Sequence, residues 1–301
     1  MSESSNTAAI TALGSGSRGN AFVVQYGKTA IMIDGGFSAR ELLRRLELLG
    51  IDPAIIRAML LTHDHDDHVR GCRVFCDKLN IPLCVSGRTA EYLRPRRKLP
   101  EKVLEFAPGE TFKLDAFQVL PFQVRHDAID PVGFRLHCGG FHIGIATDIG
   151  LLTLLAQQRL HDCDALVLES NYDQQMLLNS QRSISLKRRI MGRNGHMNNV
   201  DAVAALEQLL THRTKVLFLT HVSSECNRYS LVRELGAAKL RELCREDIHF
   251  SVIEQDTPQP PVTLAAAVPE KKPGKRTPPV TVVRDPVQLD LFDPPAVRVA
   301  K

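Results

Sequence analysis

Six consecutive residues, 63–68 (His-Asp-His-Asp-Asp-His), bring three histidines and three aspartates together directly after an apolar run. Imidazole and carboxylate groups are ligands that zinc, manganese and iron(II) accept. The apolar run has the length of a buried strand, and His63 and His65 alternate, so both can point into one pocket at an extended strand end. Asp67 and His68 follow where the chain turns and can reach a second metal ion. We therefore predict a metal site rather than a solvated turn, because isolated buried histidines do not come with this spacing.

Other apolar runs also end in ionisable residues, and each has the length of a strand. Runs at 117–124, 143–146, 166–168 and 216–220 lead to His126, Asp148, Glu169 and His221. Sheets of α/β proteins gather their sites at the carboxyl ends of strands. The chain also contains patterns typical of strands at 10–13, 21–26 and 29–33 and of helices at 69–79, 150–158, 198–210 and 228–244. This alternation predicts the α/β class.

The composition is that of a globular protein without a membrane segment. Of 301 residues, 44% are hydrophobic and 24% are charged, and no apolar run approaches the roughly twenty residues that a membrane span needs. Residues 1–9 are polar, so we expect no secretory signal. The seven cysteines are scattered and odd in number, which argues against a disulfide framework and for the cytoplasm. The net charge of +4 permits a nucleic-acid partner.

The C-terminal region has a different composition from the rest of the chain. Ten of the seventeen prolines lie between Pro258 and Pro295, interspersed with lysine and arginine. Such a segment buries too little apolar surface to order itself. We therefore predict a catalytic domain at 1–255 and a disordered tail at 256–301.

The pattern Thr62-His63-x-His65-x-Asp67-His68 resembles the signature of the metallo-β-lactamase fold, a large hydrolase superfamily. The resemblance extends over residues 10–254 and is specific, because several other motifs are similar to those of the YycJ/WalJ branch, DNA exonucleases that act from the 5′ end. These motifs are at 14–20, 33–36, 146–148, 169–173, 195–199 and 219–221. The resemblance implies a four-layer αββα sandwich.

The same resemblance implies a ligand set for two divalent ions, zinc or manganese. His63, His65 and His126 would hold the first ion, Asp67, His68 and His221 the second, and Asp148 would bridge both. Asp34 would support the metal loop without ligating. Asp67 would also orient the nucleophile, and such a pair of ions lowers the pKa of a water nucleophile.

His196 occupies the place where ribonuclease Z-like phosphodiesterases carry a Gly-His-Ser histidine that can protonate the leaving oxygen. Thioesterases and β-lactamases of the fold lack this histidine; the alternative reading is a histidine in a surface loop. A basic stretch lies just before it and suits a nucleic-acid backbone. The predicted substrate contacts are Ser17, Asn20, Asn171, Lys187, Arg188 and Arg193.

Two other features allow two interpretations each. The loop at 14–19 can present backbone N–H groups to an anion or form a plain tight turn. The basic run at 94–98 can contact phosphate or lie in solvent.

The tail contains an apolar island, Gln288-Leu289-Asp290-Leu291-Phe292, between polar segments. It resembles the peptide with which bacterial proteins bind the sliding clamp, a recognition mode that needs only a few anchoring side chains. Chance occurrence is the alternative.

Together these features predict a dinuclear metal-dependent phosphodiesterase. We expect a 5′-to-3′ DNA exonuclease in replication or repair, recruited to the nucleoid by the clamp. An RNA-processing enzyme of the same fold, a thioester or lactone hydrolase, and a clamp-binding adaptor without activity are the alternatives.

Overall fold

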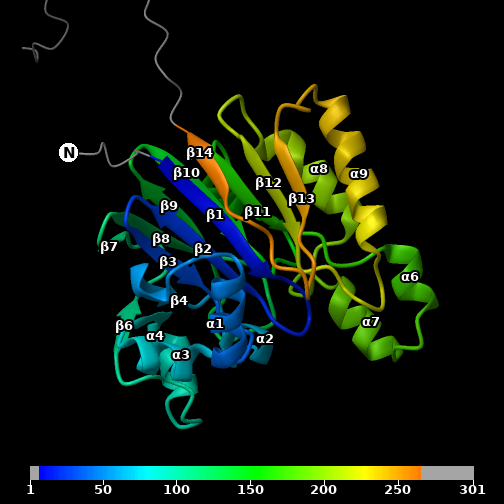
Figure 1. Ribbon diagram of the computed structural model, residues 1–301. Helices are drawn as coiled ribbons and strands as arrows, with labels where there is room; N and C mark the ends of the chain where they lie inside the picture. Colours follow the sequence, from blue (N-terminus) through cyan, green and yellow to red (C-terminus); the bar gives the residue numbers. More distant parts are fainter. Residues whose placement is uncertain (1–6, 266–301) are drawn as a thin grey trace, which may run out of the picture. The chain divides into compact units, whose positions relative to one another are not determined.

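Two β-sheets pack against each other and carry helices on their outer faces (Figure 1). The structure is a computed structural model and describes residues 7–265. In the first sheet the strand order is β14 (Val262–Ala265), β1 (Thr7–Gly14), β2 (Ala21–Tyr26), β3 (Thr29–Ile33), β4 (Ile56–Leu60), β5 (Leu83–Ser86) and β6 (Val103–Phe106). In the second it is β13 (His249–Val252), β12 (Val216–Thr220), β11 (Ala165–Glu169), β10 (Phe141–Ala146), β9 (Val132–Cys138), β8 (Phe117–Gln123) and β7 (Phe112–Leu114). The predicted α/β class and αββα sandwich are confirmed.

The main core lies between the two sheets, and a second apolar layer separates each sheet from its helices. In β3, Ile31 and Ile33 face the opposite sheet, whereas Ala30 and Met32 face the helices. A strand that is buried on both faces needs apolar residues at successive positions. This explains why the strands that lead to the site appear in the sequence as continuous apolar runs.

Within residues 7–265, three helices cover each sheet and two more lie beside the end of the second sheet. The first sheet is covered by α1 (Ala39–Leu48), α3 (Cys72–Leu79) and α4 (Gly87–Leu93), and the second by α5 (Leu154–Leu160), α8 (Asn199–Leu209) and α9 (Tyr229–Glu242). The short helix α2 (Asp66–Val69) and a 3-10 turn (Pro53–Ile55) flank β4. Helices α6 (Gln174–Asn179) and α7 (Ile184–Met191) share a small apolar cluster of their own (Figure 1).

The helix predicted at 69–79 is interrupted at Gly71, which separates α2 from α3. The N–H of Gly71 donates to the carbonyl of Gly35 at 2.7 Å. A Cβ at position 71 would lie 2.0 Å from the carbonyl oxygen of Phe37, so only glycine allows this close approach. The approach joins the metal loop to the loop after β3.

The predicted domain boundary at residue 255 is too early. Strand β14 pairs antiparallel with β1 in the register Thr7↔Ala265 to Ile10↔Val262. A sheet edge offers unpaired N–H and C=O groups to any extended segment, so the strand forms despite the proline-rich composition around it. Residues 266–301, which include the predicted clamp peptide, lie outside the described residues.

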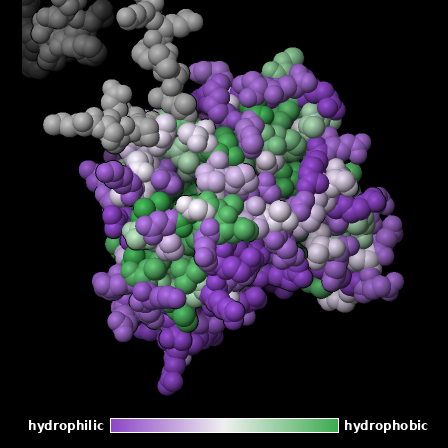
Figure 2. All heavy atoms as spheres, in the orientation of Figure 1, coloured by the Kyte–Doolittle hydropathy of each residue, from purple (hydrophilic) through white to green (hydrophobic). Residues whose placement is uncertain are grey.

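The surface agrees with this layered arrangement. On the face shown in Figure 2, hydrophilic side chains dominate most of the periphery, and hydrophobic ones form patches nearer the middle of the face. Among the helices of residues 7–265, none combines the length and the apolar character that crossing a membrane requires.

Candidate metal centre

Among the described residues, four strands deliver predicted ligands to one end of the sandwich. His63 follows β4 by way of Thr62, and Asp67 and His68 lie in α2. His126, Asp148 and His221 follow β8, β10 and β12. Both sheets therefore contribute to one site, as the pattern of strand ends predicts.

The structure brings three of the predicted histidines into one group. The ligand atoms of His63, His65 and His126 lie within 4.8 Å of one another, and His126 Nε2 is 3.2 Å from His65 Nδ1. The Nε2 atom of His63 is buried and has no hydrogen-bond partner within residues 7–265. A buried imidazole nitrogen is normally satisfied, and a metal ion held by this group would satisfy it.

The second predicted group also assembles. Asp67 Oδ2 is 3.3 Å from His221 Nε2 and 3.6 Å from His68 Nε2. Asp148 lies between both groups. Its Oδ2 is 3.1 Å from His68 Nε2, and its Oδ1 is 3.6 Å from His126 Nε2 and 3.3 Å from His221 Nδ1. It is only 4% exposed. Its position suits a carboxylate that serves two ions at once.

Hydrogen bonds on the outer side of the rings fix which nitrogen faces the centre. Nδ1 of His68 contacts Asp34 Oδ2 at 2.7 Å, and Nδ1 of His126 contacts the carbonyl of Gly195 at 2.9 Å. The hydroxyl of Thr62 donates to Asp34, so its oxygen can accept from Nδ1 of His63 at 2.9 Å. These three rings therefore present Nε2 to the centre, whereas His65 presents Nδ1. Such outer partners set the tautomer of a metal-ligating histidine.

Asp34 has the supporting role that the family resemblance implies. Its carboxylate accepts from the N–H and the hydroxyl of Thr62 at 2.8 to 3.0 Å and contacts His68, and it is fully buried. Asp34 thus holds the metal loop from behind through Thr62 and His68, and it belongs to none of the potential ligand groups among the described residues.

Glu169 is a residue of the site for which the sequence predicted no role. Its Oε1 lies 2.7 Å from Nδ1 of His196 and 2.8 Å from Nδ1 of His221. Its Oε2 accepts from the N–H groups of Ile149 and Met197 at 2.9 and 3.0 Å. All four contacts use the carboxylate within the protein, so Glu169 positions two histidines. It also belongs, with Asp148, His196 and His221, to a group whose ligand atoms lie within 4.8 Å of one another. In the sequence, its position directly at the end of an apolar run, now β11, was the feature that could have indicated a residue of the site.

His196 lies at the edge of the centre rather than on the surface. Its ring is 5.0 Å from that of His126 and 5.2 Å from that of His221, between centroids. Because Glu169 engages Nδ1, the free nitrogen is Nε2, and the side chain is 22% exposed in a cavity of about 230 Å³ that it shares with Asp67 and Asp148.

Burial and neighbouring charge act in opposite directions on these groups. Burial alone would raise the pKa of Asp148, but the imidazoles of His221, His68 and His126 hold that pKa well below its usual range. Burial, reinforced by His68, lowers the pKa of His63 well below its ordinary value. For His196, burial would lower the pKa, yet the Glu169 carboxylate outweighs it and raises the pKa. An ionised Asp148 beside a neutral His63 is the state that a metal ion requires.

The predicted substrate residues fall into different environments. Ser17 lines the same cavity as His196. Asn20 is fully buried, and its amide nitrogen lies 3.0 Å from His68 Nε2, so it faces the metal centre from within the protein. Asn171 is 5% exposed and donates to the carbonyl of His221 at 2.7 Å. Both asparagines support the metal loops, since their amides are held by histidine-bearing segments.

The basic stretch is only partly directed at the centre. The ammonium of Lys187 donates to the carbonyls of Leu178 and Ser180 at 2.7 Å, which ends α6 rather than reaching a substrate. Arg188 and Arg193 are exposed and do not line the cavity. The arginines that line it are Arg182 and Arg189, which pair with Glu225 and Asp127.

The loop at 14–19 and the basic run at 94–98 have different surroundings. In the loop at 14–19, the N–H groups of Ser15, Gly16, Arg18 and Gly19 bond within the protein, which favours the tight turn. In the basic run, Arg96 stacks on Tyr92, with its guanidinium 3.6 Å from the ring centroid. Arg96 and Lys98 line a cavity together with His65 and Asp67. The basic run therefore borders the site.

The residues present fit a pair of divalent ions. The site combines imidazoles and carboxylates, which zinc and manganese accept. It also contains a second orphaned atom within the described residues, Asp148 Oδ2, for which no hydrogen bond is formed.

Comparison with known proteins identifies relatives in sequence and in structure. Residues 29–222 match the family described as the Beta-lactamase superfamily domain. The chain is 31% identical to the exodeoxyribonuclease YycJ of Bacillus anthracis over 238 residues, 77% of this chain and 89% of that protein. It is 28% identical to the exodeoxyribonuclease WalJ of Streptococcus pneumoniae over 239 residues, 76% of this chain and 88% of that protein.

Two solved structures share the fold at lower identity. The metallo-β-lactamase fold protein YhfI of Bacillus subtilis aligns with a TM-score of 0.63 at 17% identity, over 84% of this chain and 99% of that chain. The short form of human tRNase Z aligns with a TM-score of 0.58 at 17% identity, over 83% and 98%. Taken with the strand-end ligands and the αββα layers, these matches show that the chain belongs to the metallo-β-lactamase superfamily of hydrolases, in the family that includes YycJ and WalJ.

Proposed function

We propose that this chain is a dinuclear metal-dependent phosphodiesterase that degrades DNA from the 5′ end. The observation that carries the proposal is His196, held by Glu169 at 2.7 Å beside both ligand groups. A hydrolase that acts on a diester needs a group to protonate the departing oxygen, and this imidazole has the position for it. The relatives named exodeoxyribonuclease support DNA as the substrate.

Each residue of the centre has a defined task in this proposal. His63, His65 and His126 would hold one ion, Asp67, His68 and His221 the other, and Asp148 both. Bound divalent ions supply positive charge to the phosphate and lower the pKa of a water nucleophile. Zinc and manganese both suit this ligand set.

The protein's own residues would move the protons. Asp67 lines the cavity and can accept a hydrogen bond from the attacking water and orient it. The water oxygen forms a new bond to phosphorus as the bond from phosphorus to the 3′ oxygen breaks. His196 gives its proton to that departing 3′ oxygen, and Glu169 holds the ring in place during the transfer. The departing nucleotide leaves with a 3′ hydroxyl, and the remaining strand keeps a 5′ phosphate.

Recruitment by the sliding clamp is a further part of the proposal. Residues 288–292 resemble a clamp-binding peptide and lie outside the described residues. Clamp binding would place the enzyme at the nucleoid, in replication or repair. Deletion of residues 286–301 should abolish binding to a purified clamp and leave the cleavage of short oligonucleotides unchanged. A deletion variant that still binds the clamp would exclude this role for the peptide.

A time course on labelled nucleic acids tests the activity. Matched single-stranded DNA and RNA, labelled at either the 5′ or the 3′ end, would be incubated with enzyme in manganese and in zinc, with Asp148→Ala as the inactive control. Immediate release of a short product from the 5′ label on DNA is expected. Efficient cleavage of RNA with inert DNA would replace the proposal by RNA processing.

A further inference from the structure

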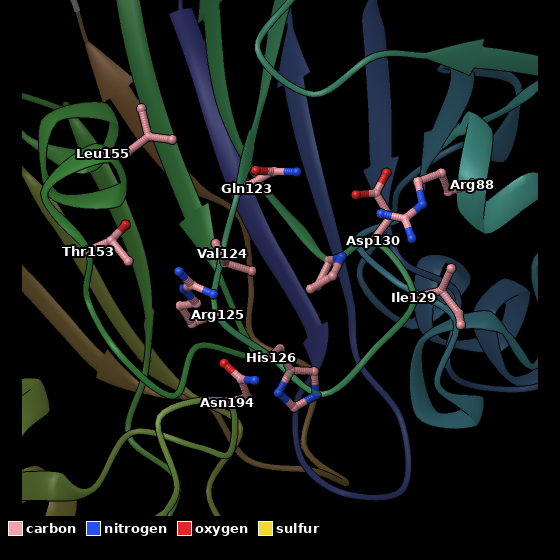
Figure 3. A pocket seen from close by; sticks show the side chains of 11 residues that line it. Arg88, Gln123, Val124, Arg125, His126, Ile129, Asp130, Thr153, Leu155 and Asn194 are labelled. Carbon is pink, nitrogen blue, oxygen red and sulfur yellow. The ribbon is translucent and has the colours of Figure 1, made fainter.

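A cavity of about 440 Å³ lies beside His126, next to the metal centre (Figure 3). Figure 3 shows Arg125 and Asn194 on the side of His126, and Arg88 and Asp130 on the opposite side. Its volume is in the range of pockets that enclose small organic ligands. Apart from His126, its residues have no task in the mechanism above.

The two arginines of this cavity carry charge without a partner. Neither Arg88 nor Arg125 forms an ion pair or a side-chain hydrogen bond with the described part of the chain. By contrast, Arg182 and Arg189 at the metal centre are both paired. The cavity thus holds two free guanidinium groups against one carboxylate, that of Asp130. Guanidinium groups bind phosphate through paired hydrogen bonds, so a phosphate is the group that matches them.

The rest of the lining suits the other parts of a nucleotide. Leu155 and Ile129 are 41% and 38% exposed, which offers apolar surface to a base. The amides of Gln123 and Asn194 can exchange hydrogen bonds with a sugar or a base edge. The Asp130 carboxylate can accept a hydrogen bond from a sugar hydroxyl or from an N–H group of a base. A free inorganic anion would leave the apolar side chains and the two amides of the cavity without a partner.

The position of the cavity relates its occupant to the reaction. It shares His126 with the centre, and Asn194 lies two residues before His196. A nucleotide in the cavity would therefore be joined to the scissile phosphate on the side of His196, which protonates the departing oxygen. The occupant is then the departing nucleotide.

We propose that this cavity binds the 5′-terminal nucleotide of the DNA, with its 5′ phosphate between Arg88 and Arg125. This inference rests on the proposed function above. It also explains how one cleavage prepares the next. Breaking the bond to the 3′ oxygen leaves a new 5′ phosphate on the remaining strand, which is the group that the two arginines bind.

Two substrates that differ only at the 5′ end test the site. The value of kcat/KM would be measured on single-stranded DNA with a 5′ phosphate and with a 5′ hydroxyl. We expect the wild type to prefer the phosphorylated end by about ten- to hundredfold, the effect of a hydrogen bond to a charged group. Arg125→Gln and Arg88→Gln should each remove most of this preference. Arg241→Gln, which alters an exposed arginine on α9, should keep it.

Direct binding separates this inference from the proposed function. The dissociation constants of thymidine 5′-monophosphate and of thymidine would be measured for the wild type and the three variants. If the wild type cleaves no DNA but binds the monophosphate through Arg88 and Arg125, the proposed function fails and the nucleotide site stands. If the enzyme degrades both DNA ends equally, or if both cavity variants bind the monophosphate as the wild type does, the site is refuted. A small chromogenic phosphodiester should be hydrolysed equally by the wild type and by the Arg241→Gln control.

Discussion

Replacing Glu169 by glutamine tests whether this carboxylate positions the histidines of the centre. The change keeps the shape of the side chain but converts one acceptor oxygen into an N–H donor. That donor would face either the imidazole N–H groups of His196 and His221, at 2.7 and 2.8 Å, or the N–H groups of Ile149 and Met197, at 2.9 and 3.0 Å. In each case two hydrogen bonds to a charged acceptor are lost.

The expected effect follows from these contacts. One hydrogen bond to a charged group contributes about 1.5 to 3 kcal/mol, and removing the outer partner of a metal-ligating histidine costs about ten- to hundredfold in metal affinity or activity. We therefore expect Glu169→Gln to lower kcat about a hundredfold. The Glu169 carboxylate also raises the pKa of His196. Without it the alkaline limb of the pH profile, where the acid loses its proton, should move to lower pH.

The assay separates the two histidines. Steady-state kinetics on single-stranded DNA would be measured from pH 5 to pH 10, and bound metal would be determined by elemental analysis. Loss of kcat with full metal content assigns the effect to His196, and loss of metal assigns it to His221. Glu246→Gln, an exposed glutamate near the end of α9, is the matched control. A folded Glu169→Gln enzyme with the wild-type kcat and pH profile would refute the positioning role.

Three other substitutions have equally definite outcomes. Asp148→Ala should abolish cleavage and remove metal from both groups, since one carboxylate serves both; elemental analysis that finds two ions per chain would contradict this. His196→Ala should retain the metal content and lower kcat about a hundredfold, and full activity would exclude it as the acid. The hydrogen bond that Arg44 donates to Glu41 lowers the pKa of this carboxyl from 4.5 to about 2. Arg45 lowers the pKa as well, whereas burial opposes both. The stability that this shift provides is present above pH 4.5 and is lost as the pH falls through 2. Because the Glu41 side chain is 29% exposed, we expect Glu41→Gln to cost about 1 to 2 kcal/mol at pH 7 and less at pH 3, measured by urea unfolding.

The metal ligands could be predicted because their signal is local. Strands buried on both faces are rich in apolar residues, so the ionisable residues that follow such runs stand out in the sequence. His126 and Asp148 are examples: neither belongs to the dense motif at 63–68, yet each follows a strand of the second sheet. The parallel pairing of β10, β11 and β12 brings Asp148, Glu169 and His221 to one edge. Strands β8 and β10 both pair antiparallel with β9, so they run in the same direction and His126 reaches that edge as well.

The supporting residues could not be assigned in the same way because their partners are distant in sequence. Glu169 follows an apolar run as Asp148 does, and nothing local distinguishes a ligand from a residue that holds a ligand. Its role depends on contacts with residues 27 and 52 positions away. Asn20 is likewise 48 positions from His68, and the break of the helix at Gly71 depends on Phe37. Such contacts exist only once the sheets have packed.

The arrangement of the histidines explains why so many polar groups can be buried at one place. In isolation the orphaned Nε2 of His63 and Oδ2 of Asp148 would each cost free energy. The outer hydrogen bonds with Asp34, Thr62 and Glu169 satisfy the ring nitrogens of His68, His63, His196 and His221 that point away from the centre. These hydrogen bonds therefore orient the rings in the folded protein before an ion binds. The free energy of metal binding is then not reduced by the entropy cost of ordering the histidine side chains. Each ion that binds the folded state and not the unfolded state stabilises the folded protein. The buried polar network, which costs free energy without metal, therefore favours metal binding.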